Sequence, residues 1–129
     1  MRRRLLDQCS LGEQVVPTIA IQLNPALLSN PDLDLRYVLP ETIEARSGRM
    51  VSDDGFDYGR TSDRMTVFLR TADVEASIPA VLDALDIEIL GNRLLEEGVI
   101  VATAAQDHCH DENEYTVVYP TESGAFSLE

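Results

Sequence analysis

The chain has 129 residues, a hydrophobic fraction of 44%, and a net charge of −13 from 23 acidic and 10 basic residues. This length suits one domain of ordinary size, and the apolar content is sufficient for a core. An acidic surface repels nucleic acid and anionic membranes, so we expect no nucleic-acid or membrane partner, whereas a basic protein would be attracted.

Several classes of enzyme are excluded by what the sequence lacks. It contains no lysine, which rules out Schiff-base chemistry, a pyridoxal phosphate linkage, a P-loop and a Ser–Lys nucleophile pair. Neither G-x-S-x-G nor G-x-G-x-x-G occurs among its glycines, so two further families of active site are absent. We therefore expect no cofactor and lean towards a protein that is not an enzyme.

The compartment can be inferred from the cysteines and from the start of the chain. Cys9 and Cys109 are too few to form a disulfide framework. The arginine-rich start lacks the apolar stretch of a signal peptide, and no apolar run reaches the ~20 residues of a membrane span. These features predict a reduced, cytoplasmic protein. We expect a flexible N-terminal arm over 1–13, a single domain over 14–120 and a C-terminal tail over 121–129.

The first half of the domain predicts a strand, a helix and a second strand. Residues 15–23 are β-branched and apolar, which favours a buried strand. Asn30-Pro31 is typical of a helix start, and Gly48 is placed to end that helix. Its apolar stripe consists of Leu35, Leu39 and Ile43. Residues 49–60 resemble a strand, in which Asp54-Gly55 could form either a hairpin turn or a bulge.

The second half repeats this alternation. Residues 64–71 predict a strand, and 73–86 predict a helix capped by Asp73. The apolar face expected for this helix consists of Val74, Ile78, Leu82 and Leu85. Residues 98–104 and 114–120 predict two more strands, which we expect to pair.

The two predicted helices resemble each other in sequence. When Pro40 is aligned with Pro79, Asp34 matches Asp73 and the apolar positions coincide. A duplicated strand–helix–strand unit predicts an α+β, ferredoxin-like βαββαβ sandwich, with two helices on one face of a four- to five-stranded antiparallel sheet. Because proline inside a helix removes a hydrogen bond, we expect each helix to kink or restart near its proline.

The central strands are apolar on both sides, although the helices of such a fold cover one face only. The segments concerned are 18–23, 65–69 and 99–104. An uncovered apolar sheet face needs a partner. A homodimer is therefore predicted.

Both histidines of the chain lie in the motif His108-Cys109-His110. Residues at i and i+2 of an extended chain point to the same side, so the two histidines could share a metal ion with Cys9 or with nearby acids (Asp107, Asp111 and Glu112). No C-x-x-C or H-E-x-x-H spacing accompanies them. The polar tip of a hairpin is the favoured interpretation, and no metal is expected.

A second candidate site lies in the segment 52–59, where aromatic side chains alternate with acids. The residues concerned are Asp53, Asp54, Phe56, Asp57 and Tyr58. Aromatics among acids are plausible anchors for a basic protein partner. Solvated acids in a turn are the simpler alternative.

A third candidate is an anion pocket near Arg60, Arg64 or Arg70, since guanidinium groups suit carboxylates and phosphates. Surface ion pairs are the alternative.

Three functions follow from these sites. The first is a non-catalytic acidic protein that acts through protein–protein interaction, for example as an immunity- or antitoxin-like binding module. The second is a small-ligand-sensing regulatory module, with the ligand at a dimer interface near the arginines. The third is a metal-dependent enzyme that uses His108 and His110.

Overall fold

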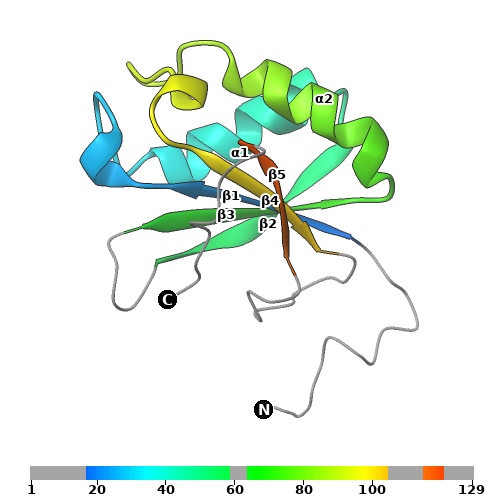
Figure 1. Ribbon diagram of the computed structural model, residues 1–129. Coiled ribbons are helices and arrows are strands. Elements are labelled where there is room, and N and C mark those ends of the chain that lie inside the picture. The colour runs from blue at the N-terminus through cyan, green and yellow to red at the C-terminus, as the bar shows by residue number, and fades with distance from the viewer. Residues whose placement is uncertain (1–16, 59–63, 105–114, 121–129) are drawn as a thin grey trace.

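The computed structural model describes residues 17–58, 64–104 and 115–120 (Figure 1). The strands are β1 (Thr18–Leu23), β2 (Val51–Tyr58), β3 (Met65–Thr71), β4 (Ile100–Ala104) and β5 (Thr116–Tyr119). The helices are α1 (Leu35–Arg46) and α2 (Val74–Leu85), with short 3-10 helices at Pro25–Leu27 (η2) and Leu94–Glu96 (η3). No helix in this described part is long and apolar enough to cross a membrane.

The five strands form one sheet in the order β2-β3-β1-β4-β5, and every neighbouring pair is antiparallel. Both helices lie on the same face of this sheet (Figure 1). The prediction of an α+β fold with two helices on an antiparallel sheet is therefore confirmed. The expected pairing of the last two strands is confirmed as well, because β4 and β5 are neighbours.

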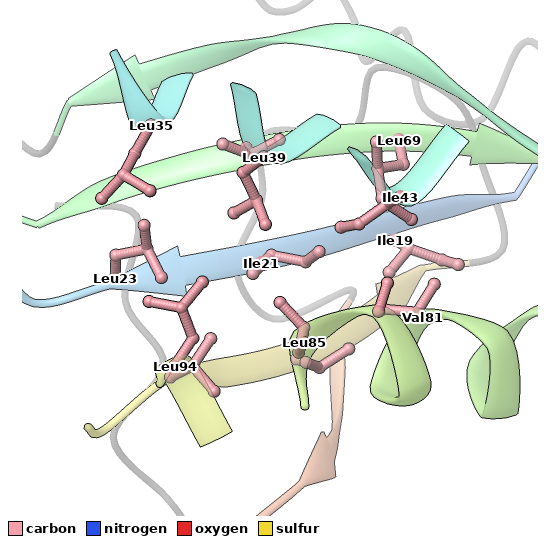
Figure 2. Packing of buried hydrophobic residues seen from close by; sticks show 14 of the residues in the cluster. Ile19, Ile21, Leu23, Leu35, Leu39, Ile43, Leu69, Val81, Leu85 and Leu94 are labelled. Atoms are coloured by element: carbon pink, nitrogen blue, oxygen red, sulfur yellow. The ribbon is translucent and has the colours of Figure 1, made fainter. Parts of the chain in front are cut away.

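The main core lies between the sheet and the helices (Figure 2). Alternate residues of β1 and β3 point towards the helices, as the period of two in a strand requires. The stripe predicted for α1 is confirmed, since Leu35, Leu39 and Ile43 are all buried against the sheet. Strand and helix residues together fill this layer: Ile19, Ile21, Leu23, Met65, Val67, Leu69, Val81, Leu85, Leu94 and Val101.

The opposite face of the sheet is also shielded from solvent, within a single chain. Its buried residues are Thr18, Ala20, Gln22, Thr66, Phe68, Ile100, Ala102 and Ala104. The homodimer that was predicted to cover this face stays a prediction.

The two helices correspond to each other in length and position. Each has twelve residues, α2 begins 39 positions after α1, and each is preceded by an aspartate at its N-cap. The Asp73 carboxylate accepts a hydrogen bond from the N–H of Ala76, as predicted. Of the two alternatives predicted at the prolines, a restart is wrong, because Pro40 and Pro79 each lie at the sixth position of one uninterrupted helix, and a kink stays a prediction.

Two details of the helix predictions are corrected. Helix α1 begins at Leu35 and not at Asn30, because Asn30 bonds to the 90–92 segment and the Asp32 carboxylate accepts from the N–H of Asp34 in a turn. In α2 the fully buried face is shifted by one position relative to the prediction. Leu85 is buried as expected, whereas Val74, Ile78 and Leu82 are half-buried and the rest of the face consists of Ser77, Val81 and Ala84.

Hydrogen bonds within the core accommodate the polar Ser77 on the buried face of α2. The Ser77 hydroxyl is 2.6 Å from the Thr71 hydroxyl at the end of β3, and it donates to the carbonyl of Asp73 at 2.7 Å. A buried polar group is tolerated when its hydrogen bonds are made. Apolar periodicity alone could not place a serine on the core face.

The segment that precedes α1 is tied to the loop that follows α2. Asn92, which is fully buried, accepts from the N–H of Asn30 and donates to its carbonyl, both at 2.7 Å. Next to it, the Glu97 carboxylate accepts from the N–H and the hydroxyl of Ser29, at 2.8 and 2.9 Å, and from the N–H of Arg93 at 3.0 Å. Two irregular segments are thus fixed by side chain–backbone bonds.

Replacing Glu97 with glutamine should produce a stability difference that depends on pH. Hydrogen bonds from the backbone N–H of Arg93 and then of Ser29 lower the pKa of the Glu97 carboxyl. A lowered pKa in the folded state contributes stability above the unfolded value of about 4.3, and this contribution is lost as pH falls through the folded pKa. At neutral pH we expect Glu97→Gln to cost at most about 1 kcal/mol, because this half-buried residue keeps its carboxylate in contact with solvent, which screens the charge.

Urea unfolding of both proteins at neutral pH and in steps down to pH 3 measures this difference. The gap between the two unfolding free energies should be largest at neutral pH and should close on acidification. A gap that stays constant over this range would contradict the proposed role of the ionised carboxylate.

Candidate functional site: an aromatic patch at the sheet edge

Strand β2 lies at one edge of the sheet and carries an irregularity that reorients its side chains. Asp53 lies opposite Leu69 and Phe56 lies opposite Val67, so three steps along β2 match two steps along β3. This is a β-bulge, with Gly55 at a φ of 101°. The sequence left a hairpin turn and a bulge as alternatives, and the structure contains the bulge within one continuous strand.

The bulge decides which residues lie beside helix α1. Val67 and Met65 belong to the core between sheet and helices, and their partners on β2 are Phe56 and Tyr58. Because side chains alternate along a strand, one inserted residue turns the following side chains over. Phe56 and Tyr58 thereby lie on the helix side of β2, where Asp57 would lie without the bulge.

These two rings join Tyr37 of α1 in an exposed cluster. The ring centroids are 6.0 Å apart for Tyr37 and Phe56 and 5.8 Å apart for Phe56 and Tyr58, and both pairs are edge-to-face. The exposed fractions are 56% for Tyr37, 38% for Phe56 and 39% for Tyr58. Large rings held in a fixed geometry and left open to solvent are typical of binding surfaces.

Arg36 of α1 completes the cluster. Its guanidinium carbon is 4.8 Å from the centroid of the Tyr37 ring and 5.5 Å from that of Phe56, and its Nη1 donates to the Tyr58 hydroxyl at 3.2 Å. That hydrogen bond is the main reason why the pKa of Arg36 is raised. We call Arg36, Tyr37, Phe56 and Tyr58 the edge patch.

The three predicted aspartates of this strand have different environments. Asp53 and Asp57 are exposed, and each accepts a backbone N–H, from Gly55 and from Tyr58, both at 2.9 Å. The Asp54 side chain is only 9% exposed and its carboxylate lies 3.5 Å from Nε of Arg70. Asp53 and Asp57 therefore contribute charge to the surface of β2, whereas Asp54 forms an ion pair.

The arginines proposed for an anion pocket are dispersed. Arg64 is half-buried and its Nη1 donates to the Gln22 side chain at 3.1 Å. Arg70 pairs with Asp54, and this ion pair is partly buried because the Asp54 side chain is largely covered. Arg60 lies outside the described residues. Arg64 and Arg70 thus have different partners, and the partner of Arg64 is the buried amide of Gln22.

The candidate metal ligands predicted from the sequence belong to segments that the structure does not describe. His108, Cys109 and His110 lie outside the described residues, as do Cys9, Asp107, Asp111 and Glu112. Within the ranges that are described, no group of three or more His, Cys, Asp or Glu side chains could hold a metal ion.

Half of the edge patch was missed by the sequence analysis. Phe56 and Tyr58 were predicted to bind a partner, whereas Arg36 and Tyr37 were not. Both residues lie off the apolar stripe of α1, next to Leu35. A tyrosine at an exposed helical position was the only indication available without knowing that β2 packs beside this helix.

Comparisons with known proteins do not extend this description. No family model, no curated protein and no solved structure matches the chain. The functional argument therefore depends on the geometry of its own residues.

Proposed function

We propose that this protein is a non-catalytic binding module that docks a basic, extended segment of a partner protein along the edge of β2. The observation that carries the proposal is the exposed three-ring edge patch beside the outer edge of the sheet. Among the described strands, β2 pairs with β3 alone. Its outer side thus presents backbone N–H and C=O groups that an added strand can use.

The rings favour a cationic side chain in the docked segment. The Arg36 guanidinium lies at cation–π distance from the rings of Tyr37 and Phe56. Because aromatic faces attract cations, the exposed rings also suit a guanidinium or ammonium group of a partner. The shielded Nε of Arg36 has no hydrogen-bond partner within the described residues. Arg36 is therefore held mainly by ring contacts and by one hydrogen bond to Tyr58.

The acids of β2 discriminate between partners. Asp53 and Asp57 are exposed on this strand, and bulges and charges at an edge are known devices against self-association. Two copies of β2 that pair edge to edge would bring four such carboxylates together, which is unfavourable. A basic segment would instead be attracted by them and by the net charge of −13.

A ferredoxin-like arrangement with one added strand is part of the proposal. The element order β1-α1-β2-β3-α2-β4 and the sheet order β2-β3-β1-β4 support it, with β5 appended next to β4. In that arrangement β2 is an edge strand, so the docking edge follows from the topology. The fold itself carries no functional assignment.

A selection from a random peptide library on the immobilised protein tests the docking edge. We expect enriched peptides in which Arg or Lys alternates with apolar residues, with an affinity that falls as salt concentration rises. Phe56→Ser and Tyr58→Ser should each weaken binding of these peptides at least about ten-fold, equivalent to about 1.4 kcal/mol.

Leu33→Ser is the matched control, because Leu33 is 63% exposed and lies outside the edge patch. It should bind the selected peptides like the wild type. Enrichment of acidic peptides, or equal binding by Phe56→Ser and the wild type, would overturn the proposal. Thermal unfolding of each variant checks that the substitutions leave the fold intact.

A further inference from the structure

A separate cavity of about 210 Å³ lies where β1 ends and β4 begins. Buried Gln22, Val99 and Ile100 form its inner part, and the more exposed Asn24, Leu27, Gly98 and Pro120 form its rim, with Arg64 between them. Gly98 approaches Leu27 so closely that a Cβ atom there would lie 2.5 Å from Leu27 Cδ1. Gly98 and the Leu27 side chain thus pack closely at the rim of the cavity, and a Cβ atom at position 98 would force Leu27 to move.

The polar end of this cavity is fixed by a hydrogen-bonded chain. Gln22 has a polar side chain, yet it lies on the central strand and is only 1% exposed. Its Nε2 donates to Oγ1 of Thr66, and its Oε1 accepts from Nη1 of Arg64, both at 3.1 Å. Because the threonine and the arginine engage opposite ends of the amide, Gln22 has one orientation and holds the guanidinium at the cavity.

We propose that this cavity binds a small monocarboxylate with an apolar body of the size of one aromatic ring. The carboxylate contacts Arg64, and the ring packs against Val99, Ile100 and Pro120. An apolar cavity of about 150 Å³ accepts benzene in another protein, so 210 Å³ accommodates a ring with a carboxylate attached. This site goes beyond the proposed docking edge and does not depend on it.

The charge of the site favours a singly charged carboxylate. A planar guanidinium matches the two oxygens of a carboxylate, and the match is stronger in a half-buried position than in water. Arg64 has further interactions, and a bound carboxylate would join or replace them. A net charge of −13 repels a dianion such as phosphate more strongly than a monoanion.

Calorimetric titration with benzoate, benzamide and inorganic phosphate tests the proposal on the full chain. We expect benzoate to bind the wild type at least about ten-fold more tightly than benzamide, which has the same shape without the charge. Arg64→Gln should lose at least about ten-fold in benzoate affinity. Arg70→Gln is the matched control, because Arg70 lies in β3 outside the cavity, and this variant should bind benzoate like the wild type.

A second measurement keeps the proposal testable if Arg64→Gln fails to fold. Benzoate added to the isotopically labelled wild type should shift the methyl resonances of Leu27, Val99 and Ile100, and should leave those of Leu39 unchanged. Equal affinity for benzoate and benzamide, preferential binding of phosphate, unchanged binding in Arg64→Gln, or shifts elsewhere in the protein would overturn the assignment.

Discussion

Replacing Leu39 with alanine is expected to lower the free energy of unfolding by about 2–5 kcal/mol. Leu39 is fully buried in the layer between α1 and the sheet (Figure 2). The substitution removes apolar contacts and leaves a cavity, because Leu39 belongs to a close-packed core to which the sheet and both helices contribute. Urea unfolding followed by circular dichroism measures the loss.

Leu33→Ala is the matched control for this experiment. It removes the same atoms from a side chain that is 63% exposed, so we expect a change within about 0.5 kcal/mol of the wild type. If Leu39→Ala cost no more than Leu33→Ala, the position of α1 on the sheet would be wrong. That result would also remove Tyr37 from its place beside β2.

Elements with a strong local pattern could be predicted from the sequence. The stripe of Leu35, Leu39 and Ile43 has helical spacing, and Asp73 is a good N-cap whose carboxylate bonds as expected. The similarity between the two helices was likewise visible in the alignment of their prolines. Each of these features depends on residues that are close together in the sequence, so spacing and residue type are sufficient to predict it.

Elements that depend on distant contacts could not be predicted in this way. Asn30-Pro31 has the composition of a helix start, but Asn30 bonds to Asn92, which is 62 positions away in the sequence. The bulge in β2 is defined only by the register with β3. Local propensity is overridden at both places by partners that the sequence does not identify.

The candidate sites differ, for the same reason, in how far the sequence could predict them. Phe56 and Tyr58 were predicted from aromatics alternating with acids, which is a local pattern. Tyr37 and the cavity around Arg64 depend on tertiary packing, because they combine residues from separate elements. The edge patch was therefore half predictable, and Gln22, which orients Arg64, could not be distinguished from any other residue of a strand.

Hydrogen bonds between Asn92 and Asn30 hold the segment before α1 against the loop after α2. Replacing Asn92 with alanine should lower the free energy of unfolding by about 2–3 kcal/mol. The Asn92 side chain is fully buried and bonds to the N–H and carbonyl of Asn30 at 2.7 Å and to the carbonyls of Ile89 and Leu90 at 3.2 and 3.3 Å. Alanine removes four hydrogen bonds and leaves the N–H of Asn30 without its partner. The carbonyls of Asn30, Ile89 and Leu90 each keep one other hydrogen bond.

Asn24→Ala is the control for this prediction. Asn24 accepts one hydrogen bond, from the N–H of Ala26, at a site exposed to solvent. Its loss should cost about 1 kcal/mol or less, because water can replace the side chain there. If urea unfolding gave the same loss of unfolding free energy for Asn92→Ala and Asn24→Ala, burial of the Asn92 hydrogen bonds would not add to stability. The segment before α1 would then be held in place by apolar packing, and the contact with Asn30 would contribute little.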